Sequence, residues 1–501
     1  MLGDALTGPF FEHLLTFPGT QQPLDDLFTK GLREQLTKVL AAALVHVREL
    51  EATVGVTLAD LLAKQAAMAK LNAALAPFHT LAAVWAGGVM LGGRACDDVG
   101  YGDLTRSIAD HGVADPAALS HPTMGRMLAT GIGATGGAQA GPDAPRALPY
   151  DLTFPEVFFP TGSAVAKRGF DVVLGNPPWD AIQFKSKEFF AAFDFEILSA
   201  PTKRERERME VEALQAPAVR ALLEHYKEDF EQQKRANDVL YRYQKVQIEG
   251  DLAGRQLDAF RVFMERNAQL LAPTGCLTGV VVLSAFHANE GATGVRRLYL
   301  EEMGLRCCYS FENRRKLFEI DSRFKFAIIL ASRTGPTLEF PCAFYLHDDE
   351  WLFQPRAAIR YSLAFVRRTG GPHLSIIELR CRMDQMIANQ MHQCAQSFVG
   401  VTSRLGVRLQ KSPAALDISK YSRRFEEAPR HTHKHEHPVR GSALLEDWWY
   451  TKARHFAISD DRWGSHPRYL LPLAKANDLP LHVERACDYQ IAIKEKFLLN
   501  K

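Results

Sequence analysis

One short segment of the sequence has residue types suited to a specific kind of chemistry: Arg-Gly-Phe-Asp-Val-Val-Leu-Gly-Asn-Pro-Pro-Trp-Asp, at positions 168–180. Its apolar run predicts a short buried strand that ends at Asn176, followed by two prolines and a tryptophan. Neither proline has a backbone N–H and each fixes its own φ, so the turn cannot continue a sheet and is held stiff. The turn therefore presents two neutral acceptors side by side, the Asn176 amide oxygen and the Pro177 carbonyl oxygen.

Two convergent acceptors of this kind can hold both hydrogens of an –NH2 group. Holding them aims the nitrogen lone pair at an electrophile without a strong base. Trp179 can lie flat on a planar ring that carries the amine, as when a base is taken out of its stack. Ligands of open α/β sheets bind beyond the carboxyl ends of the strands, which is where Asn176 is expected. The alternative is an ordinary turn followed by a packing tryptophan.

The segment FDVVLGNPPW resembles the catalytic motif of amino-methyltransferases that use S-adenosylmethionine. Its tryptophan form is typical of large adenine-N6 DNA methyltransferases from fused bacterial restriction-modification and phage-defence systems. Other segments resemble the same family in the same order, namely DLTFPEVFF before the motif, then LLAPTGCLTGVVVLSAF and GVRRLYLEEMGLRCCYSFENRRKLFEIDSRFKFAIILA. The resemblance covers residues 150–333 and implies the later strands of a Rossmann-like class I methyltransferase sheet.

The resemblance also implies a cofactor, a substrate and residue roles. The cofactor would be S-adenosylmethionine, and the substrate double-stranded DNA with a flipped adenine. Asn176 and Pro177 would hold the adenine amine, Pro178 would fix the turn, and Trp179 would stack on the flipped ring. Asp171, just before the predicted strand, is a candidate cofactor contact.

Three further segments carry residue types that can bind DNA or a metal. Arg314 and Arg315 follow a predicted strand and are candidate contacts to DNA phosphates. The aromatic segment EDWWYTKARHF, residues 446–456, either stacks on DNA or packs in a core. Four histidines alternate within residues 431–437, and we interpret them as a solvated loop, so no metal site is predicted.

The family's cofactor motif, an acidic or aromatic residue with a Gly-rich loop such as D-P-A-C-G-S-G, is not found in residues 1–175. The only candidates, GVMLGGRACDD and GIGATGGAQAG, lack the preceding strand and the residue order. We therefore expect a larger enzyme whose first strands lie on an absent segment or on a separate subunit. A nuclease subunit is another expected partner. Alternatives are a non-catalytic DNA-binding or assembly subunit, a truncated remnant, or methylation of glutamine or RNA amines.

The periodicity of apolar residues predicts an α/β protein in three parts. Residues 1–149 form an α-helical region that ends in a Gly-rich linker. Residues 150–333 are the part that the resemblance implies to be a catalytic domain, with a charged helical insertion at 183–270. Residues 334–501 change to a mixed α+β texture with many arginines, which suggests a DNA target-recognition region.

Within the catalytic domain, strands are expected at 275–286, 305–313 and 324–333, and a helix at 291–303. Together with the strand before Asn176, these make four strands of a mostly parallel sheet. The short link between the last two strands favours an antiparallel hairpin at the edge of the sheet.

The composition is that of an ordinary globular protein. The chain has 501 residues, 47% hydrophobic and 24% charged, with a formal net charge of +2. No global field indicates nucleic acid or membrane, so a basic surface must be local. No apolar run reaches membrane-spanning length and the start lacks a signal peptide, so we expect a cytoplasmic protein with no membrane partner. Eight cysteines without CxxC spacing are expected to be reduced thiols.

Overall fold

The structure is a computed structural model that divides into two units, Met1–Gln396 and Ser397–Lys501. It describes residues 4–52, 54–133, 147–165, 168–200, 202–248, 250–254, 256–353, 358–394, 425–427 and 497–499. In the second unit, the described strands β9 (Phe425–Glu427) and β10 (Phe497–Leu499) pair antiparallel. The four histidines and the aromatic segment 446–456 lie outside the described residues. The rest of the structure belongs to the first unit.

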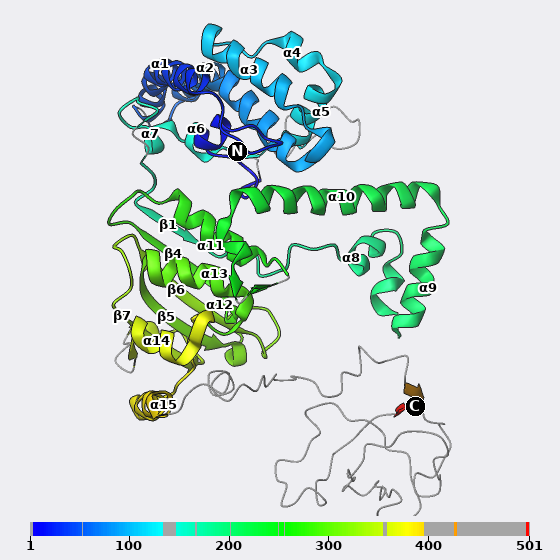
Figure 1. Ribbon diagram of the computed structural model, residues 1–501, viewed down its shortest axis with the longest axis vertical. Helices are drawn as coiled ribbons and strands as arrows, with labels where there is room; N and C mark the ends of the chain where they lie inside the picture. The colour runs from blue at the N-terminus through cyan, green and yellow to red at the C-terminus, as the bar shows by residue number, and fades with distance from the viewer. Residues whose placement is uncertain are drawn as a thin grey trace, which may run out of the picture. The chain divides into compact units, whose positions relative to one another are not determined.

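The N-terminal region is helical, as the sequence predicts. Its helices are α1 (Asp26–Glu51), α2 (Leu58–Leu91), α3 (Asp98–His111), α4 (Pro116–Ser120) and α5 (Pro122–Gly131), followed by the single turns α6 (Tyr150–Thr153) and α7 (Pro155–Phe158) (Figure 1). In α1, Leu32, Leu36 and Leu40 are fully buried at a spacing of four residues. This spacing places them on one face of the helix, which packs into the core of the region.

Helix α2 is the central helix of this region. A capping box fixes its start, because the Thr57 side chain accepts from the Asp60 N–H. By length and composition α2 could cross a membrane, but 67% of its most apolar window is buried inside the protein. It crosses α5 at very short range: a Cβ on Gly87 or Gly131 would lie 1.8 Å from a backbone carbonyl oxygen of the facing helix. Glycine is therefore required at this crossing.

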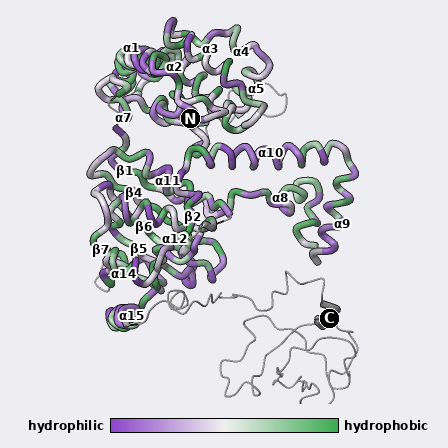
Figure 2. The backbone as a smooth tube through the Cα atoms, viewed as in Figure 1, coloured by the Kyte–Doolittle hydropathy of each residue, from purple (hydrophilic) through white to green (hydrophobic). Residues whose placement is uncertain are grey.

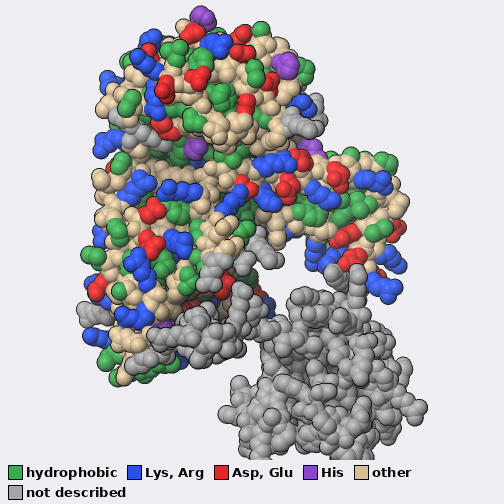
Figure 3. Space-filling model, viewed as in Figure 1, with side chains coloured by type: hydrophobic (Ala, Val, Ile, Leu, Met, Phe, Trp, Pro, Cys, Tyr) green, Lys and Arg blue, Asp and Glu red, His purple; other side chains and the backbone are tan. Residues whose placement is uncertain are grey.

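The charged insertion forms a helical arm, which Figure 1 shows extending from the sheet. It contains α8 (Ser186–Ala191), α9 (Lys203–Ala213) and the long α10 (Pro217–Leu240). Phe190, Ile197 and Leu223 form a small apolar core of its own. Hydrophilic and apolar residues alternate along α10 (Figure 2), and Figure 3 shows basic and acidic side chains mixed on the arm. The mixed signs are typical of a solvated helical surface.

The chain then returns to the sheet through a short irregular segment. This segment holds the two-residue strands β2 (Gln247–Ile248) and β3 (Asp251–Leu252), which pair with each other. It leads into α11 (Ala259–Leu270), which connects the two cores of the unit. Val262 of α11 packs in the core of the helical region, whereas Met264 packs in the core of the sheet.

A six-stranded sheet forms the second half of the unit. Its strands are β1 (Val172–Gly175), β4 (Leu277–Leu283), β5 (Gly304–Glu312), β6 (Lys325–Ser332), β7 (Glu339–Leu346) and β8 (Ile359–Ser362), in the order β1-β4-β6-β5-β7-β8. β1 is parallel to β4 and β5 is parallel to β7, whereas β6 is antiparallel to β4 and β5, and β8 to β7. Strands β1, β4, β5 and β7 therefore share one direction.

The four predicted strands are present, but β1, predicted as a buried strand, is largely exposed because no described strand covers its outer side, and the arrangement of the other strands also differs from the prediction. β5 and β6 form the expected antiparallel hairpin, yet the hairpin is not at the edge, because β6 inserts between β4 and β5. The sheet also continues past residue 333, the expected domain boundary, because the apolar strand β7 pairs with β5. Two helices follow, α14 (Leu363–Gly370) and α15 (Arg382–Cys394). The sheet was predicted to be mostly parallel, but only the pairs β1–β4 and β5–β7 are parallel, and the other three pairs are antiparallel.

One face of the sheet is covered by helices. Thr278, Val280 and Val282 alternate along β4 and are buried beneath α11 and α13 (Thr293–Arg297). Leu277, Val281 and Leu283 point to the opposite face and are only half-buried. Cys96, Cys276, Cys307, Cys308, Cys342 and Cys381 are free thiols, as expected for these residues.

Candidate active site at the end of strand β1

The strand before the Asn-Pro-Pro turn is held in register by its neighbours. Phe170 donates its N–H to the Leu270 carbonyl at 2.9 Å and accepts from Ala272 at 3.0 Å. The Leu277 N–H donates to the Asp171 carbonyl at 3.0 Å, which starts the parallel pairing of β1 with β4. These bonds fix where β1 ends and therefore where Asn176 stands.

The turn itself is anchored on both sides and leaves the asparagine free. Pro177 is buried, whereas Asn176 and Pro178 are exposed. After the turn, the Asp180 carbonyl accepts from Ala259 at 2.9 Å, which attaches the chain to the start of α11. No described residue hydrogen-bonds to the Asn176 side chain. Its amide oxygen is therefore available to a ligand.

Trp179 is fixed in place behind the turn. Its indole N–H donates to the Val281 carbonyl of β4 at 3.2 Å. Its ring stacks on Phe326 with centroids 6.2 Å apart and 16° between planes, and meets Phe318 edge-on at 5.5 Å. Trp179 is half-buried, so part of the ring is still open to solvent. Through these contacts Trp179 acts as a wedge, meaning that its ring packs between the turn and the sheet and fixes one to the other.

A groove of about 440 Å³ runs along the outer side of β1 to the turn. All four residues of β1, the segment Asn176–Pro178, Tyr150 and one side of α11 line it. From α11 the groove receives Arg266 and Asn267, which are 1% and 8% exposed. The groove thus combines apolar walls with a few polar groups, as ligand and peptide sites commonly do.

Arg266 is a buried cation that the sequence analysis missed. Its guanidinium donates to the Leu6 and Gly8 carbonyls at 2.8 and 2.9 Å. The rings of Phe10 and Tyr241 lie 5.2 and 5.0 Å from it. Nε and Nη1 have no hydrogen-bond partner among the described residues.

A signal for Arg266 was present in the sequence. It stands four residues from both Val262 and Leu270, which are buried apolar residues of the same helix. An arginine on the apolar stripe of an amphipathic helix is unusual and indicates a buried charge with specific partners.

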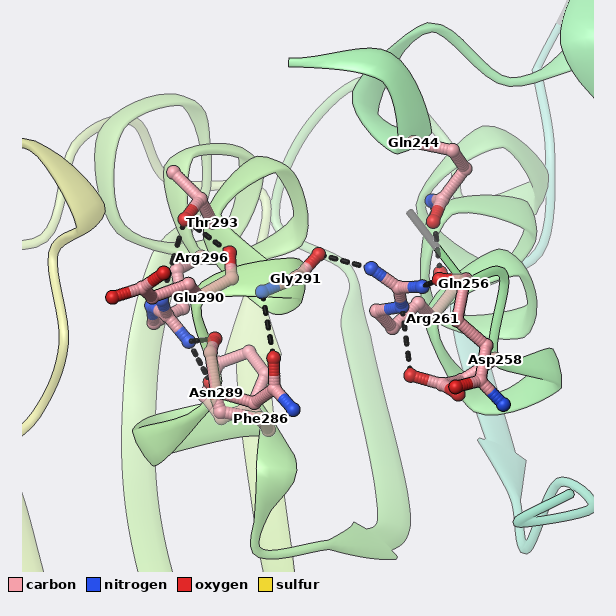
Figure 4. A network of polar contacts seen from close by, with 10 residues as sticks. All are labelled: Gln244, Gln256, Asp258, Arg261, Phe286, Asn289, Glu290, Gly291, Thr293 and Arg296. Carbon is pink, nitrogen blue, oxygen red and sulfur yellow. Dashed lines mark hydrogen bonds and ion pairs between the residues drawn. The ribbon is translucent and has the colours of Figure 1, made fainter. Parts of the chain in front are cut away.

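Two more buried arginines hold the loop that follows β4 (Figure 4). Arg296 donates to the Phe286 and Asn289 carbonyls, both at 2.7 Å, and burial lowers its pKa to about 9. Arg261 donates to the Gly291 carbonyl and pairs with Asp258 at 3.2 Å. The loop at the carboxyl end of β4, next to the Asn176 turn, is therefore rigid.

The structure separates the other predicted site residues. Arg314 and Arg315 follow β5, and because β5 runs in the direction of β1, they lie at the same edge of the sheet as Asn176. Three strand spacings separate β5 from β1, roughly 14 Å. Asp171 lies at the opposite end of β1, roughly 16 Å from Asn176 along the strand. Asp171 is thus not brought together with Asn176, and its cofactor contact stays a prediction.

Both arginines after β5 are exposed and already paired. Arg314, 68% exposed, lies 2.6 Å from Glu312, and Arg315, 66% exposed, lies 3.0 Å from Asp348. Burial acts to raise the pKa of Glu312, but His347, Arg314 and Lys325 outweigh it and hold this pKa below its usual value. The carboxylate therefore stays charged and fixes Arg314 at the sheet edge.

The same edge contains a second ion-pair chain. Glu378 accepts from His287 at 2.9 Å and from Lys325 at 2.9 Å. These hydrogen bonds lower the pKa of Glu378 to about 2. His287 is fully buried just after the end of β4. Through Glu378, these ion pairs join the segment after α14 to the sheet.

The described residues do not form the Gly-rich cofactor loop of the resembled family. In the segment 88–98, residues up to Leu91 end helix α2, and Gly92 and Gly93 lead by a short 3-10 helix into α3, so no strand precedes the glycines. The segment 131–141 begins at the end of α5, and most of it lies outside the described residues. The described part of the chain therefore shows no loop of the kind that holds S-adenosylmethionine in the resembled family.

Known proteins resemble this chain only in solved structures, with low sequence identity and over part of the chain. No family model and no curated protein matches the chain. Among solved structures, the chain is similar to one from work on complex assembly and conformational transition of the type I restriction-modification system, at 14% identity and a TM-score of 0.26 over 57% of this chain and 51% of that one.

Two further solved structures are similar in part. One is a modification subunit assigned to a type I restriction enzyme from Vibrio vulnificus YJ016, at 12% identity and a TM-score of 0.24 over 39% of this chain and 34% of that one. The other is the M protein of the type I restriction enzyme EcoKI, at 11% identity and a TM-score of 0.21 over 32% and 46%. The chain thus spans about half, or less, of the solved chains it matches. Because identity and TM-score are low, the function proposed below depends on the geometry of the turn.

Proposed function

We propose that this chain holds the adenine amine in a DNA adenine-N6 methyltransferase of a restriction-modification or phage-defence system. The observation that supports the proposal is the stiff turn at the end of β1, where Asn176 is exposed without a described partner and Trp179 is fixed to β4. The Asn176 amide oxygen and the Pro177 carbonyl would accept the two amine hydrogens, while Pro178 keeps the turn in shape. The open part of Trp179 would support the flipped base.

The methyl group would come from S-adenosylmethionine, which the resembled family uses. The described residues of this chain supply only the amine side of the reaction: they orient the nitrogen and exclude water from one side of the ring. Arg314 and Arg315, exposed at the same edge as Asn176, would contact DNA phosphates. We propose a cytoplasmic protein that works with a subunit carrying the cofactor half, and with a nuclease where cleavage accompanies methylation. The region after residue 334 would contribute to target recognition.

A second function is favoured by one specific observation. No strand precedes β1 in the described part of the chain, so the strand-and-glycine cofactor loop of the resembled family is not seen there. This favours a non-catalytic DNA-binding or assembly subunit that keeps the sheet. Isothermal titration of the chain with S-adenosylmethionine separates the two functions, because 1:1 binding would exclude the second.

Methyl transfer tests the first function directly. Labelled S-adenosylmethionine is incubated with double-stranded DNA and the chain, alone and with the polypeptide encoded directly upstream of it. We expect label in adenine N6, and a loss of about 100-fold or more with Asn176→Ala. Asn176 is exposed, so this substitution should change the free energy of unfolding by no more than about 0.5 kcal/mol. Transfer that is unaffected by Asn176→Ala would exclude the proposed roles.

A further inference from the structure

Two of the free thiols face each other across neighbouring strands of the sheet. Cys308 of β5 and Cys342 of β7 are direct partners in the parallel pairing of these strands. Both side chains are fully buried and belong to the core of the sheet. Cys307, the residue before Cys308, lies outside this core, because successive residues of a strand point to opposite faces. The sheet itself therefore aligns Cys308 with Cys342.

The spacing of this pair suits a disulfide bond. Directly paired residues have Cα atoms roughly 4.8 Å apart, which is the spacing of neighbouring strands. Disulfide-bonded cysteines have Cα atoms roughly 4.4–6.8 Å apart, so the bond requires little movement of either strand. The two thiols are hydrogen-bonded to each other in the reduced chain. Cys342 is the donor, because the bond lowers the pKa of Cys308 and raises that of Cys342.

A histidine next to the pair makes Cys308 the more acidic thiol. The hydrogen bond from Cys342, together with His287, lowers the pKa of Cys308 against the opposing effect of burial. Burial acts to lower the pKa of His287, but Cys308 and Glu378 outweigh it and raise this pKa to about 9. Glu378 accepts from His287 at 2.9 Å and so holds the imidazole in place. Cys308 is thus a thiolate stabilised by a histidine cation, and Cys342 is a thiol.

Cysteines beside a histidine can also bind zinc, whose structural sites take four protein ligands. In the described part of the chain, no group of three His, Cys, Asp or Glu side chains is placed to hold a metal ion. An acidic thiolate next to a second thiol is instead typical of cysteines that react with oxidants. Hydrogen peroxide is nearly as small as water and can reach a buried thiolate when the structure opens locally.

We propose that Cys308 and Cys342 are a redox-active pair, which hydrogen peroxide converts into a disulfide between β5 and β7. The Cys308 thiolate attacks one peroxide oxygen and breaks the O–O bond, which leaves a sulfenic acid on Cys308 and releases hydroxide. The hydroxide takes a proton from His287 and leaves as water. The Cys342 thiol then attacks the sulfenic sulfur, so the S–S bond forms, the S–O bond breaks and a second water leaves. The two sulfur atoms lose two electrons, which the peroxide gains.

Disulfide formation alters the edge of the sheet that carries Asn176. The thiolate beside His287 disappears, so the imidazole loses one of the two interactions that keep it protonated. His287 lies just after β4 and is linked through Glu378 to Lys325. Oxidation should therefore weaken this link, and reduction should restore it. The bond should be easily reduced, because directly paired strands hold the two Cα atoms near the lower limit for a disulfide.

Thiol mapping of the full chain tests the pair. The folded chain is treated with hydrogen peroxide, its remaining thiols are alkylated in urea, and a non-reducing digest is measured by mass spectrometry. We expect linked peptides that contain Cys308 and Cys342, two hydrogens lighter than the reduced peptides, and dithiothreitol should separate them. When peroxide is added to the chain already unfolded in urea, this linkage should form about tenfold less, because the strands no longer align the two thiols.

Substitutions assign the roles within the pair. Cys307→Ser is the matched control, because Cys307 adjoins Cys308 but points to the opposite face, and it should keep the linkage. Cys308→Ser should abolish the linkage. In Cys342→Ser the sulfenic acid on Cys308 has no partner and should be trapped by dimedone. His287→Gln should slow formation of the linkage about tenfold or more, because the thiolate loses its cation.

Several results would overturn the proposal. Cys308 and Cys342 both stay reduced in the wild type at a peroxide concentration that oxidises the exposed Cys381. The linkage contains Cys307 in place of Cys308, or it forms as readily in urea as in the folded chain. A zinc ion that co-purifies and protects both thiols would identify a metal site instead. These results are read on the wild type, so they do not depend on whether a variant folds.

Discussion

Replacing Trp179 with phenylalanine should loosen the Asn-Pro-Pro turn by about 1 kcal/mol. Phenylalanine keeps a ring against Phe318 and Phe326 but loses the indole N–H that donates to the Val281 carbonyl at 3.2 Å. A part-buried hydrogen bond of this kind contributes about 1 kcal/mol. Trp179→Ala also loses the two aromatic contacts, each about 1 kcal/mol, so its total cost should be about 3 kcal/mol.

Urea unfolding of the full chain, followed by circular dichroism, measures both changes as shifts of the midpoint. Phe353→Ala is the control, because this side chain is 84% exposed and its loss should stay within about 0.5 kcal/mol. The order of stability should be wild type and Phe353→Ala, then Trp179→Phe, then Trp179→Ala. If both Trp179 variants unfold with the control, the tryptophan is not a wedge, and the rigidity attributed to the turn has another source.

Three further substitutions test the packing of the first unit. Arg266→Met removes a buried charged donor from two backbone carbonyls and should lower the free energy of unfolding by about 3 kcal/mol in urea; a loss below about 1 kcal/mol would contradict the buried geometry. Gly131→Ala should lower the melting temperature strongly, because the new Cβ would lie 1.8 Å from a carbonyl oxygen of α2. Gly125→Ala in the same helix is the control and should be neutral or stabilising, because the nearest atom to its Cβ lies 3.4 Å away. Equal effects of the two substitutions would exclude the close crossing of α2 and α5. Glu378 has a pKa of about 2 in the folded chain against an ordinary 4.5, so its stabilisation is present above pH 4.5 and is lost as the pH falls through 2. Between pH 6 and pH 2 the wild type should lose about 3 kcal/mol more than Glu378→Gln in unfolding experiments, and parallel curves for the two would show that the ion-pair chain does not form.

The sequence predicted the local elements of the site well, because each is encoded by a short pattern. The apolar run before Asn176 gave β1, the helical periodicity of residues 32–91 gave the first two helices, and the short link after β5 gave the antiparallel hairpin. The position of β6 between β4 and β5 could not be predicted from such local patterns. Which strands lie side by side depends on pairing between segments far apart in the chain, and no local pattern specifies it.

The surroundings of the turn were also beyond local reasoning. The sequence leaves open whether Trp179 stacks on a base or packs against the protein, and it does not identify Phe318 and Phe326, more than 130 residues away, as the rings that contact it. Asp171 lies at the other end of β1 from Asn176, and its contact with the cofactor stays a prediction. The partners of Arg266, unlike its place on the apolar face of α11, depend on how α11 packs against the N-terminal segment.

The amino-acid sequence by itself determined which chemical groups stand at the turn: two prolines, an asparagine and a tryptophan. It also determined that the turn is stiff, because the proline rings fix φ without any tertiary contact. Only the tertiary structure decided what surrounds them. It placed Arg314 and Arg315 at the same edge as Asn176, buried Arg266 beside β1, and left the outer edge of that strand open. The reason is physical. The functional groups of a side chain are the same in any fold, whereas the residues around it depend on pairing and packing between segments far apart in the sequence.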